Sequence, residues 1–238
     1  MLVNPNTSTA TTRMMVSLAR RALAGTGLRV RGVTAADGPA MLTGPDALRA
    51  AVPHVLAAAR AARAGGDCAA LIVGAFGDPG VAELRAPLGD APRGVGVGDI
   101  PRAVGLGGAP PVVGIGEAAL AEAAAGGRRF GIATTTPCLA DTIAAHVHRL
   151  GLAPAFTGTR FTPGDPERLA ARPEALLAAL EDAARACALR DGAEAVVIGG
   201  GPLSDAAAAL STRLRIPVIA PIPAACRRVA GLLAAASG

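Results

Sequence analysis

The sequence predicts an α/β fold with two pseudo-symmetric parallel-sheet subdomains and a cleft between them. Two observations lead to this prediction. Short apolar segments alternate with longer, alanine-rich amphipathic segments along most of the 238 residues, and this alternation is typical of parallel sheets that helices cover on both faces. In addition, the order of motifs in the first half of the chain returns in the second half.

The apolar segments predict eight strands, at residues 2–3, 28–34, 68–73, 112–115, 130–134, 153–157, 195–198 and 218–220. Alanine has the highest helix propensity, and the alanine-rich segments predict helices near residues 9–24, 46–64, 116–126, 138–150, 173–190, 203–213 and 223–236. Segment 89–111 is rich in Gly and Pro and has no helical period. It predicts a surface loop, either a tolerated insertion or a lid.

An internal repeat divides the chain. Residues 2–30 and 131–158 each contain a strand pattern, a Thr-rich turn, a helix pattern and a second strand pattern. Later in each half an apolar strand runs into a Gly-rich loop, "LIVGAFGDPG" in the first half and "AVVIGGGPL" in the second. The repeat predicts an N-terminal half at residues 1–110 and a C-terminal half at 111–222, with a final helix at 223–238 that packs back on the first half.

Four loops are expected to meet in the cleft, because parallel sheets place ligand sites beyond the carboxyl ends of their strands. They span residues 4–8, 74–80, 134–136 and 199–204, and the first contains Asn4 and Asn6, the only asparagines of the chain. Glycine amides, hydroxyls and the Asn6 amide suit a small carboxylate, although helix capping explains any single Thr or Ser equally well. The predicted substrate-binding residues are Asn6, Thr7, Ser8, Phe76, Gly77, Thr135, Thr136, Gly199, Gly200 and Gly201.

Composition argues against several other classes of protein. The pI is about 10.1, but the net charge is only +5, the arginines are scattered and aromatic residues make up 2%, so we expect no nucleic-acid binding. No apolar run has the length of a membrane span, and no signal peptide is evident; we expect a cytoplasmic protein. The four cysteines are far apart and the three histidines read as exposed, so no metal site is expected.

Five motifs, in this order, carry a resemblance to a known family: "VNPNTS", "GAFGDPG", "VVGIGEAA", "ATTTP" and "VIGGGPL". They resemble the Asp/Glu/hydantoin racemase superfamily, and hydantoin and allantoin racemases look most similar. The resemblance covers nearly the whole chain. It implies two pseudo-symmetric α/β domains, no cofactor, a small carboxylate or amide substrate and association into homo-oligomers. In these relatives two cysteines on opposite sides of the substrate remove and return the proton of the α-carbon.

The resemblance also exposes a departure, because the family's two cysteine positions correspond here to Ala75 and Gly200. Neither residue can carry a proton, so the two-thiol mechanism cannot operate. Cys138 and Cys226 each begin a predicted helix near the cleft, but core packing is the expected role of both. Asp78 and Glu117 are the candidate acid–base residues, since a carboxylate in a dry cleft can act as a base; capping and turn hydrogen bonds explain them about equally well.

Two hypotheses about function follow. The first is an enzyme of the racemase superfamily that acts at the carbon next to a carboxylate or amide of a small amino-acid- or hydantoin-like substrate. Under this first hypothesis, carboxylates replace the thiols, or the reaction is a related decarboxylation, elimination or ring opening. The second is a non-catalytic protein that binds small carboxylates in the same cleft. The fold alone does not separate them, because function resides in the site.

Overall fold

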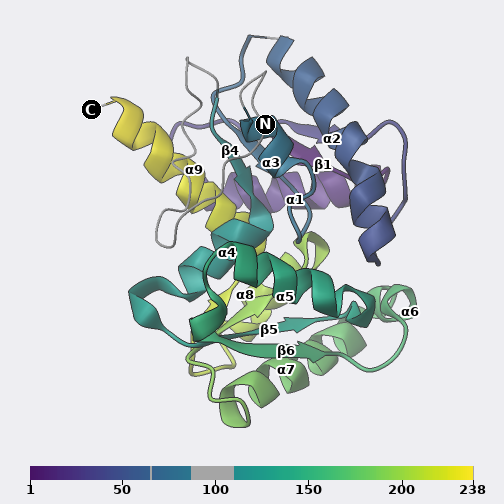
Figure 1. Ribbon diagram of the computed structural model, residues 1–238, viewed down its shortest axis with the longest axis vertical. Helices are drawn as coiled ribbons and strands as arrows, with labels where there is room; N and C mark the ends of the chain where they lie inside the picture. The colour runs from purple at the N-terminus through teal and green to yellow at the C-terminus, as the bar shows by residue number, and fades with distance from the viewer. Residues whose placement is uncertain (65, 87–109, 238) are drawn as a thin grey trace.

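The computed structural model describes residues 1–64, 66–86 and 110–237. Within these residues the chain forms two four-stranded, all-parallel sheets with helices packed on them, which confirms the predicted α/β fold (Figure 1). The strand order is β2-β1-β3-β4 in the first sheet and β6-β5-β7-β8 in the second. The two orders correspond strand by strand, which is the structural basis of the internal repeat.

The first sheet contains β1 (Leu2–Asn4), β2 (Gly32–Thr34), β3 (Leu71–Val73) and β4 (Val112–Gly114). Its accompanying helices are α1 (Thr9–Ala22), α2 (Pro45–Ala64), α3 (Val81–Arg85) and α4 (Ile115–Ala123), and a 3₁₀ turn, η1 (Ala125–Gly127), follows. β4 pairs with β3, whereas the expected boundary between residues 110 and 111 assigned it to the second half.

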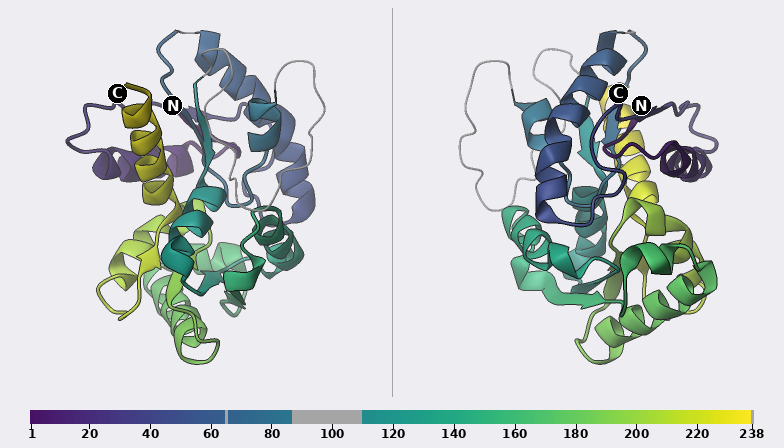
Figure 2. Two further views of the ribbon diagram at one scale, coloured as in Figure 1. Left: turned by 60° about the vertical axis from the view of Figure 1, so that its left-hand side comes forward. Right: turned by 90° about the vertical axis from the view of Figure 1, so that its right-hand side faces the viewer.

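The second sheet contains β5 (Phe130–Thr134), β6 (Phe156–Phe161), β7 (Ala195–Ile198) and β8 (Val218–Ile219). Its helices are α5 (Ala140–Arg149), α6 (Pro166–Ala170), α7 (Pro173–Leu189) and α8 (Ser204–Leu210), and the 3₁₀ turns are η2 (Pro137–Leu139), η3 (Ala153–Ala155) and η4 (Gly201–Leu203). Figure 1 shows α5 on one face of β5 and β6 and α7 on the other. The last helix, α9 (Pro221–Ser237), packs on α1 and α4, and both termini lie at the same end of the molecule (Figure 2).

Several predicted boundaries were wrong for local reasons. The strand expected at 28–34 is paired only at 32–34, and the strand expected at 153–157 begins at Phe156 because the turn η3, which contains Pro154, precedes it. Ile115, expected to end a strand, begins α4. The short helices α3 and α6 were not predicted, since five residues are too few for a helical period. The Gly- and Pro-rich loop expected at 89–111 lies outside the described residues except for 110 and 111.

One apolar cluster joins the two sheets. Alternate strand residues point to opposite faces, and the inward set of both sheets enters the same cluster, with Leu2 and Ile72 from the first sheet and Ile132 and Val197 from the second. Residues of α1, α4 and α9 complete it. The shared core holds the carboxyl edges of the two sheets in a fixed relation. None of the helices in the described parts of the chain has the length and apolar character that a membrane crossing requires.

Candidate active site

The side chain of Asn4 has a structural role in the loop after β1. It is fully buried, and the two protons of its Nδ2 are shared among three acceptors within hydrogen-bonding distance: Asn6 Oδ1 (2.8 Å), the Ser8 carbonyl oxygen (3.0 Å) and Thr12 Oγ1 (2.9 Å). Its Oδ1 accepts from the backbone N–H of Asn6 (3.2 Å). These bonds tie the end of β1 to the first turn of α1. Asn4 therefore shapes the loop and has no hydrogen-bonding group left for a ligand.

The side-chain Nδ2 of Asn6 is a donor without a partner among the described residues. Its Oδ1 accepts from Asn4 Nδ2 and from the Ser8 N–H (2.9 Å), while its Nδ2 has no hydrogen-bond partner in the described part of the chain. Ser8 caps α1, because its Oγ accepts from the Thr11 N–H (3.2 Å), so the capping explanation applies to this residue. The half-buried Thr7 donates its N–H to the Pro39 carbonyl oxygen (3.2 Å). Of the three predicted residues in this loop, Asn6 presents an amide donor.

The two Gly-rich loops lie against each other across the junction of the sheets. A Cβ on Gly199 would be 3.4 Å from Phe76 Cε1, and a Cβ on Gly201 would be 3.1 Å from the Gly74 carbonyl oxygen. At Gly201, the close approach to the backbone of Gly74 therefore depends on glycine. The phenyl ring of Phe76 is buried in the core that the two sheets share.

The loop after β3 presents unpaired backbone donors. Within the described residues, the N–H groups of residues 75–77 and of Gly200 have no hydrogen-bond acceptor, although Ala75 and Phe76 are 8% and 9% exposed. A buried N–H without a partner is costly and rare. The side of the second sheet adds Thr135, which is 7% exposed and whose hydroxyl also has no partner among these residues. This combination of donors suits carboxylate or carbonyl oxygens of a small ligand.

The loop after β5 is fixed to the loop after β7. Thr134 Oγ1 donates to the Gly199 carbonyl oxygen (2.6 Å), and Thr136 Oγ1 lies 3.4 Å from Thr134 Oγ1. The structure thus brings Thr135, Thr136, Gly199, Gly200 and Gly201 to one edge of the second sheet.

Asp78 is enclosed by hydrogen-bond donors. Its carboxylate accepts from the N–H groups of Gly116 (2.8 Å) and Glu117 (2.6 Å) at the start of α4, and from His146 Nε2 (2.9 Å). A Cβ on Gly114 would lie only 2.2 Å from Asp78 Cγ, and a Cβ on Gly116 would lie 3.0 Å from Asp78 Oδ2. The motifs "FGDPG" and "GIGE" are therefore structural partners: the glycines of the second make room for the carboxylate of the first.

Glu117 is held in a buried ion pair. Both of its carboxylate oxygens accept from the guanidinium of Arg85, at 2.9 Å for Oε2, and Oε1 also accepts from the Gly114 N–H (3.2 Å). The side chain of Glu117 is 5% exposed and that of Arg85 19%. Arg85 also donates to the Val112 carbonyl oxygen (3.0 Å from Nε). Both predicted acid–base residues thus hold loops and helix ends in place.

His146 was wrongly expected to be exposed. It is 5% exposed and lies on the buried face of α5 beside Ile143 and Val147. The sequence contains a signal for this, because these apolar residues flank His146 at helical spacing. Sequence reasoning also missed Arg85 and Arg149, which bind Glu117 and His146 respectively.

The cysteines do not lie at the two positions, 75 and 200, where the family resemblance places catalytic thiols. Cys138 was expected in the core but is exposed in the turn after "TTTP". Cys187 and Cys226 are buried, and burial raises the pKa of each thiol to about 11. The two residues at the expected cysteine positions, Ala75 and Gly200, stand at the carboxyl edges of β3 and β7.

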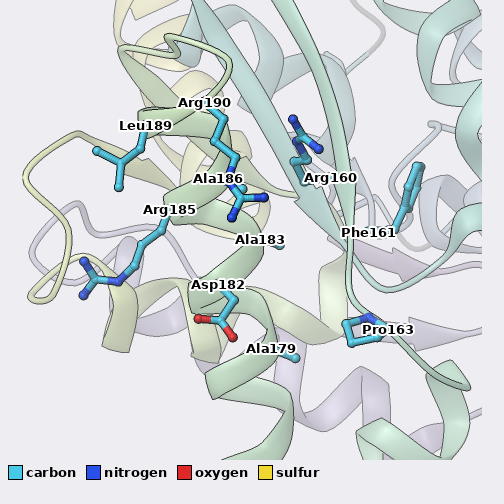
Figure 3. Close-up of a pocket in the computed structure, with 10 residues that line it drawn as sticks. All are labelled: Arg160, Phe161, Pro163, Ala179, Asp182, Ala183, Arg185, Ala186, Leu189 and Arg190. Carbon is cyan, nitrogen blue, oxygen red and sulfur yellow. The ribbon is translucent and has the colours of Figure 1, made fainter.

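A separate groove of about 510 Å³ lies between β6 and α7. In Figure 3 the side chains of Arg160 and Arg190 point into it, whereas Leu189 points away. None of the predicted site residues lines it.

Comparison with known proteins identifies the family. A model of the Asp/Glu/hydantoin racemase family matches residues 1–98 and 100–229. The chain belongs to this family. A hydantoin racemase from Paenarthrobacter aurescens is 26% identical over 234 residues, which cover 98% of this chain and 90% of that protein. Family membership and this relative support the assignment of the chain as an isomerase.

Solved structures agree with this family assignment. The allantoin racemase from Klebsiella pneumoniae superposes with a TM-score of 0.83 at 26% identity, covering 99% of this chain and 87% of that one. Arylmalonate decarboxylase, at 20% identity and a TM-score of 0.62, shares the fold, with 98% of this chain and 90% of that one covered.

Proposed function

We propose that the protein is a cofactor-independent isomerase that acts at the carbon next to a carboxylate or amide of a small amino-acid- or hydantoin-like substrate. The observation that carries this proposal is that donors without an acceptor among the described residues, from residues 75–77, Gly200, Thr135 and Asn6, stand on the loops at the carboxyl ends of strands of both sheets. Membership of the racemase family and the likeness to hydantoin and allantoin racemases supply the reaction class.

The chemistry of these donors fits the proposal. Removing a proton from a carbon next to a carbonyl places negative charge on the carbonyl oxygen, and fixed N–H groups aimed at that oxygen stabilise the charge. The donors come from loops of both sheets, so a substrate that they bind would lie between the two. Because Ala75 and Gly200 supply no base, the proton of the α-carbon would pass to water and be returned from water. Asp78 and Glu117 contribute by fixing the loops, since their oxygens already accept hydrogen bonds from backbone, His146 and Arg85.

A related decarboxylation is the second candidate function, and one observation favours it. Neither Ala75 nor Gly200 offers a base, whereas loss of CO₂ from a malonate-type acid leaves the electron pair on the α-carbon without prior proton removal. The same donors would then stabilise the resulting enolate. Only one proton, delivered afterwards, is needed to complete that reaction.

Proton exchange at the α-carbon tests the proposal. The protein is incubated in D₂O with allantoin, 5-substituted hydantoins, amino acids or an arylmalonate, and NMR follows deuterium uptake and product formation. Deuterium at the α-carbon together with loss of optical activity supports the isomerase; an arylacetate product supports the decarboxylase. Silence over the whole panel, with a ligand-induced rise in melting temperature, would reject both activities and leave a binding protein.

Restoring the thiols tests the geometry of the cleft. We expect the double variant Ala75→Cys/Gly200→Cys to gain racemisation of a hydantoin, because both positions stand at the edges of the junction. A Cβ on Gly200 would lie 3.2 Å from Leu203 Cδ1, so this side chain must shift by a few tenths of an ångström, and the backbone at Gly200 (φ 158°) must also adjust to a residue with a Cβ. The matched control is Ala75→Ser/Gly200→Ser, which has similar size and lacks a thiol. Equal rates for the two double variants would show that the two positions do not face one substrate.

A further inference from the structure

We propose that His146 is a positioning residue of this site, which acts through Asp78 on the loop of residues 75–77. The inference rests on the proposed function for its catalytic consequence. The hydrogen bond from His146 Nε2 to Asp78 Oδ2 is 2.9 Å long, and the two side chains are only 6% and 3% exposed. A bond enclosed in this way is not weakened by competition with water.

The bond links elements of different sheets. Asp78 follows β3 of the first sheet, whereas His146 lies on α5, which packs against β6 of the second. Asp78 also holds the start of α4 through the Gly116 and Glu117 N–H groups. One carboxylate therefore connects the loop after β3, the start of α4 and the helix α5.

Arg149 fixes which nitrogen of His146 carries the proton. Its guanidinium lies 2.7 Å from His146 Nδ1, and arginine has donors but no acceptor. Nδ1 is therefore the acceptor, so the proton of a neutral imidazole is on Nε2 and points at Asp78. The exposed guanidinium thus orients a buried imidazole toward the carboxylate, in the way that outer partners orient functional histidines.

The backbone of Asp78 explains why its side chain must be held. It is the one non-glycine residue with a positive φ (55°) in the described parts of the chain, a conformation that Asp tolerates better than most residues. The Asp78 N–H donates to the Ala75 carbonyl oxygen (3.1 Å) and closes the turn that contains residues 75–77. The orientation of their unpaired N–H groups therefore depends on the conformation of Asp78. Displacing such donors by about 1 Å costs around 100-fold in rate.

Amide hydrogen exchange tests the inference without any substrate. The variants are His146→Leu, which removes the donor, and His146→Gln, whose Nε2 can reach the same carboxylate. The matched control is His148→Leu, an exposed histidine on the same helix. We expect His146→Leu to speed exchange of the Asp78, Gly116 and Glu117 amides by about 10- to 100-fold, as for the loss of a hydrogen bond to a charged group. His146→Gln and His148→Leu should stay near the wild-type rates. Unchanged exchange in His146→Leu overturns the proposal.

Arg149→Met is the second variant, which keeps the test decisive if His146→Leu does not fold. Arg149 is exposed, so its removal frees Nδ1 and lets the proton move away from Asp78 without opening the core. We expect faster exchange at the same three amides by a smaller factor. Exchange at wild-type rates in this variant contradicts the assigned role of Arg149. If His146→Leu does not fold, the same result also overturns the proposal.

A catalytic measurement separates positioning from simple stabilisation. The rate of α-proton exchange of 5-methylhydantoin in D₂O is measured well below the melting temperature of each variant. We expect kcat to fall about 10- to 100-fold in His146→Leu with KM changed less, and to recover in His146→Gln. Faster amide exchange with an unchanged kcat would show that His146 stabilises the structure but does not position the donors used in catalysis. If the wild-type protein is itself inactive on this compound, the proposed function fails for it, and the amide-exchange result still decides the role of His146.

Discussion

The same substitution, Asn to Asp, should reduce stability at one asparagine of the first loop and ligand binding at the other. In Asn4→Asp an oxygen replaces Nδ2 and faces two acceptors, Asn6 Oδ1 at 2.8 Å and the Ser8 carbonyl oxygen at 3.0 Å. Thr12 can turn its hydroxyl proton toward the new oxygen. Two hydrogen bonds are lost at a fully buried position, at about 0.5–1.5 kcal/mol each. Both acceptors keep another donor, the Ser8 N–H for Asn6 Oδ1 and the Thr12 N–H for the Ser8 carbonyl oxygen, but each now faces the new carboxylate oxygen.

The expected loss of stability is large on the scale of a whole protein. With the burial of an added charge, we expect the free energy of unfolding to fall by about 3–6 kcal/mol, out of roughly 5–15 kcal/mol for a typical domain. For a chain of this length that corresponds to a fall in Tm of roughly 6–24 °C.

Asn6→Asp keeps every hydrogen bond of the loop. Its Oδ1 still accepts from Asn4 Nδ2 and the Ser8 N–H, and the added charge lies just before the start of α1, where the helix dipole favours it. We expect the free energy of unfolding to change by no more than about 1 kcal/mol. The free amide donor is lost, however, so binding of hydantoins and carboxylates should weaken by about 10-fold or more, since a carboxylate now faces the ligand oxygen.

The assay is thermal unfolding of both variants, with and without 5-methylhydantoin. A Tm of Asn4→Asp within about 2 °C of wild type would refute the assignment of Asn4 as the residue that holds the loop. A Tm of Asn6→Asp as low as that of Asn4→Asp would refute the division of roles between the two asparagines.

Two further predictions concern buried groups. Arg85→Met leaves the carboxylate of Glu117 buried without its partner and should lower the free energy of unfolding by about 3–5 kcal/mol, which urea unfolding measures. The double variant Arg85→Met/Glu117→Leu should recover most of this loss. An unchanged urea midpoint in Arg85→Met would contradict the ion pair. At pH 8, iodoacetamide should modify the exposed Cys138 and spare Cys187 and Cys226, because burial raises the pKa of both thiols to about 11 and only about a thousandth of each is thiolate. Peptide mass mapping checks this, and equal labelling of all three in the native protein would disprove the burial.

The sequence by itself determined the fold class, the order of the elements and the family. These features depend on patterns that are local in the chain. Runs such as those around Ile72 and Val197 read as buried parallel strands, and the Gly-rich segments after them mark the carboxyl edges where the loops meet. The repeat of these patterns predicted two equivalent sheets, and the motif order predicted the family.

Only the tertiary structure decided what the polar residues of the site do. Asp78 is bonded to Gly116 and His146, which are 38 and 68 residues away in the chain, and Arg85 reaches Glu117 over 32 residues. No periodicity encodes such pairs, because they form only when elements distant in the chain pack together, within the first sheet for the Gly116 and Glu117 pairs and across the two sheets for the His146 pair. The sequence therefore predicts a donor-rich cleft at the ends of the strands. The packing of the sheets determines which carboxylates, amides and imidazoles are occupied in holding that cleft together and which remain free for a substrate.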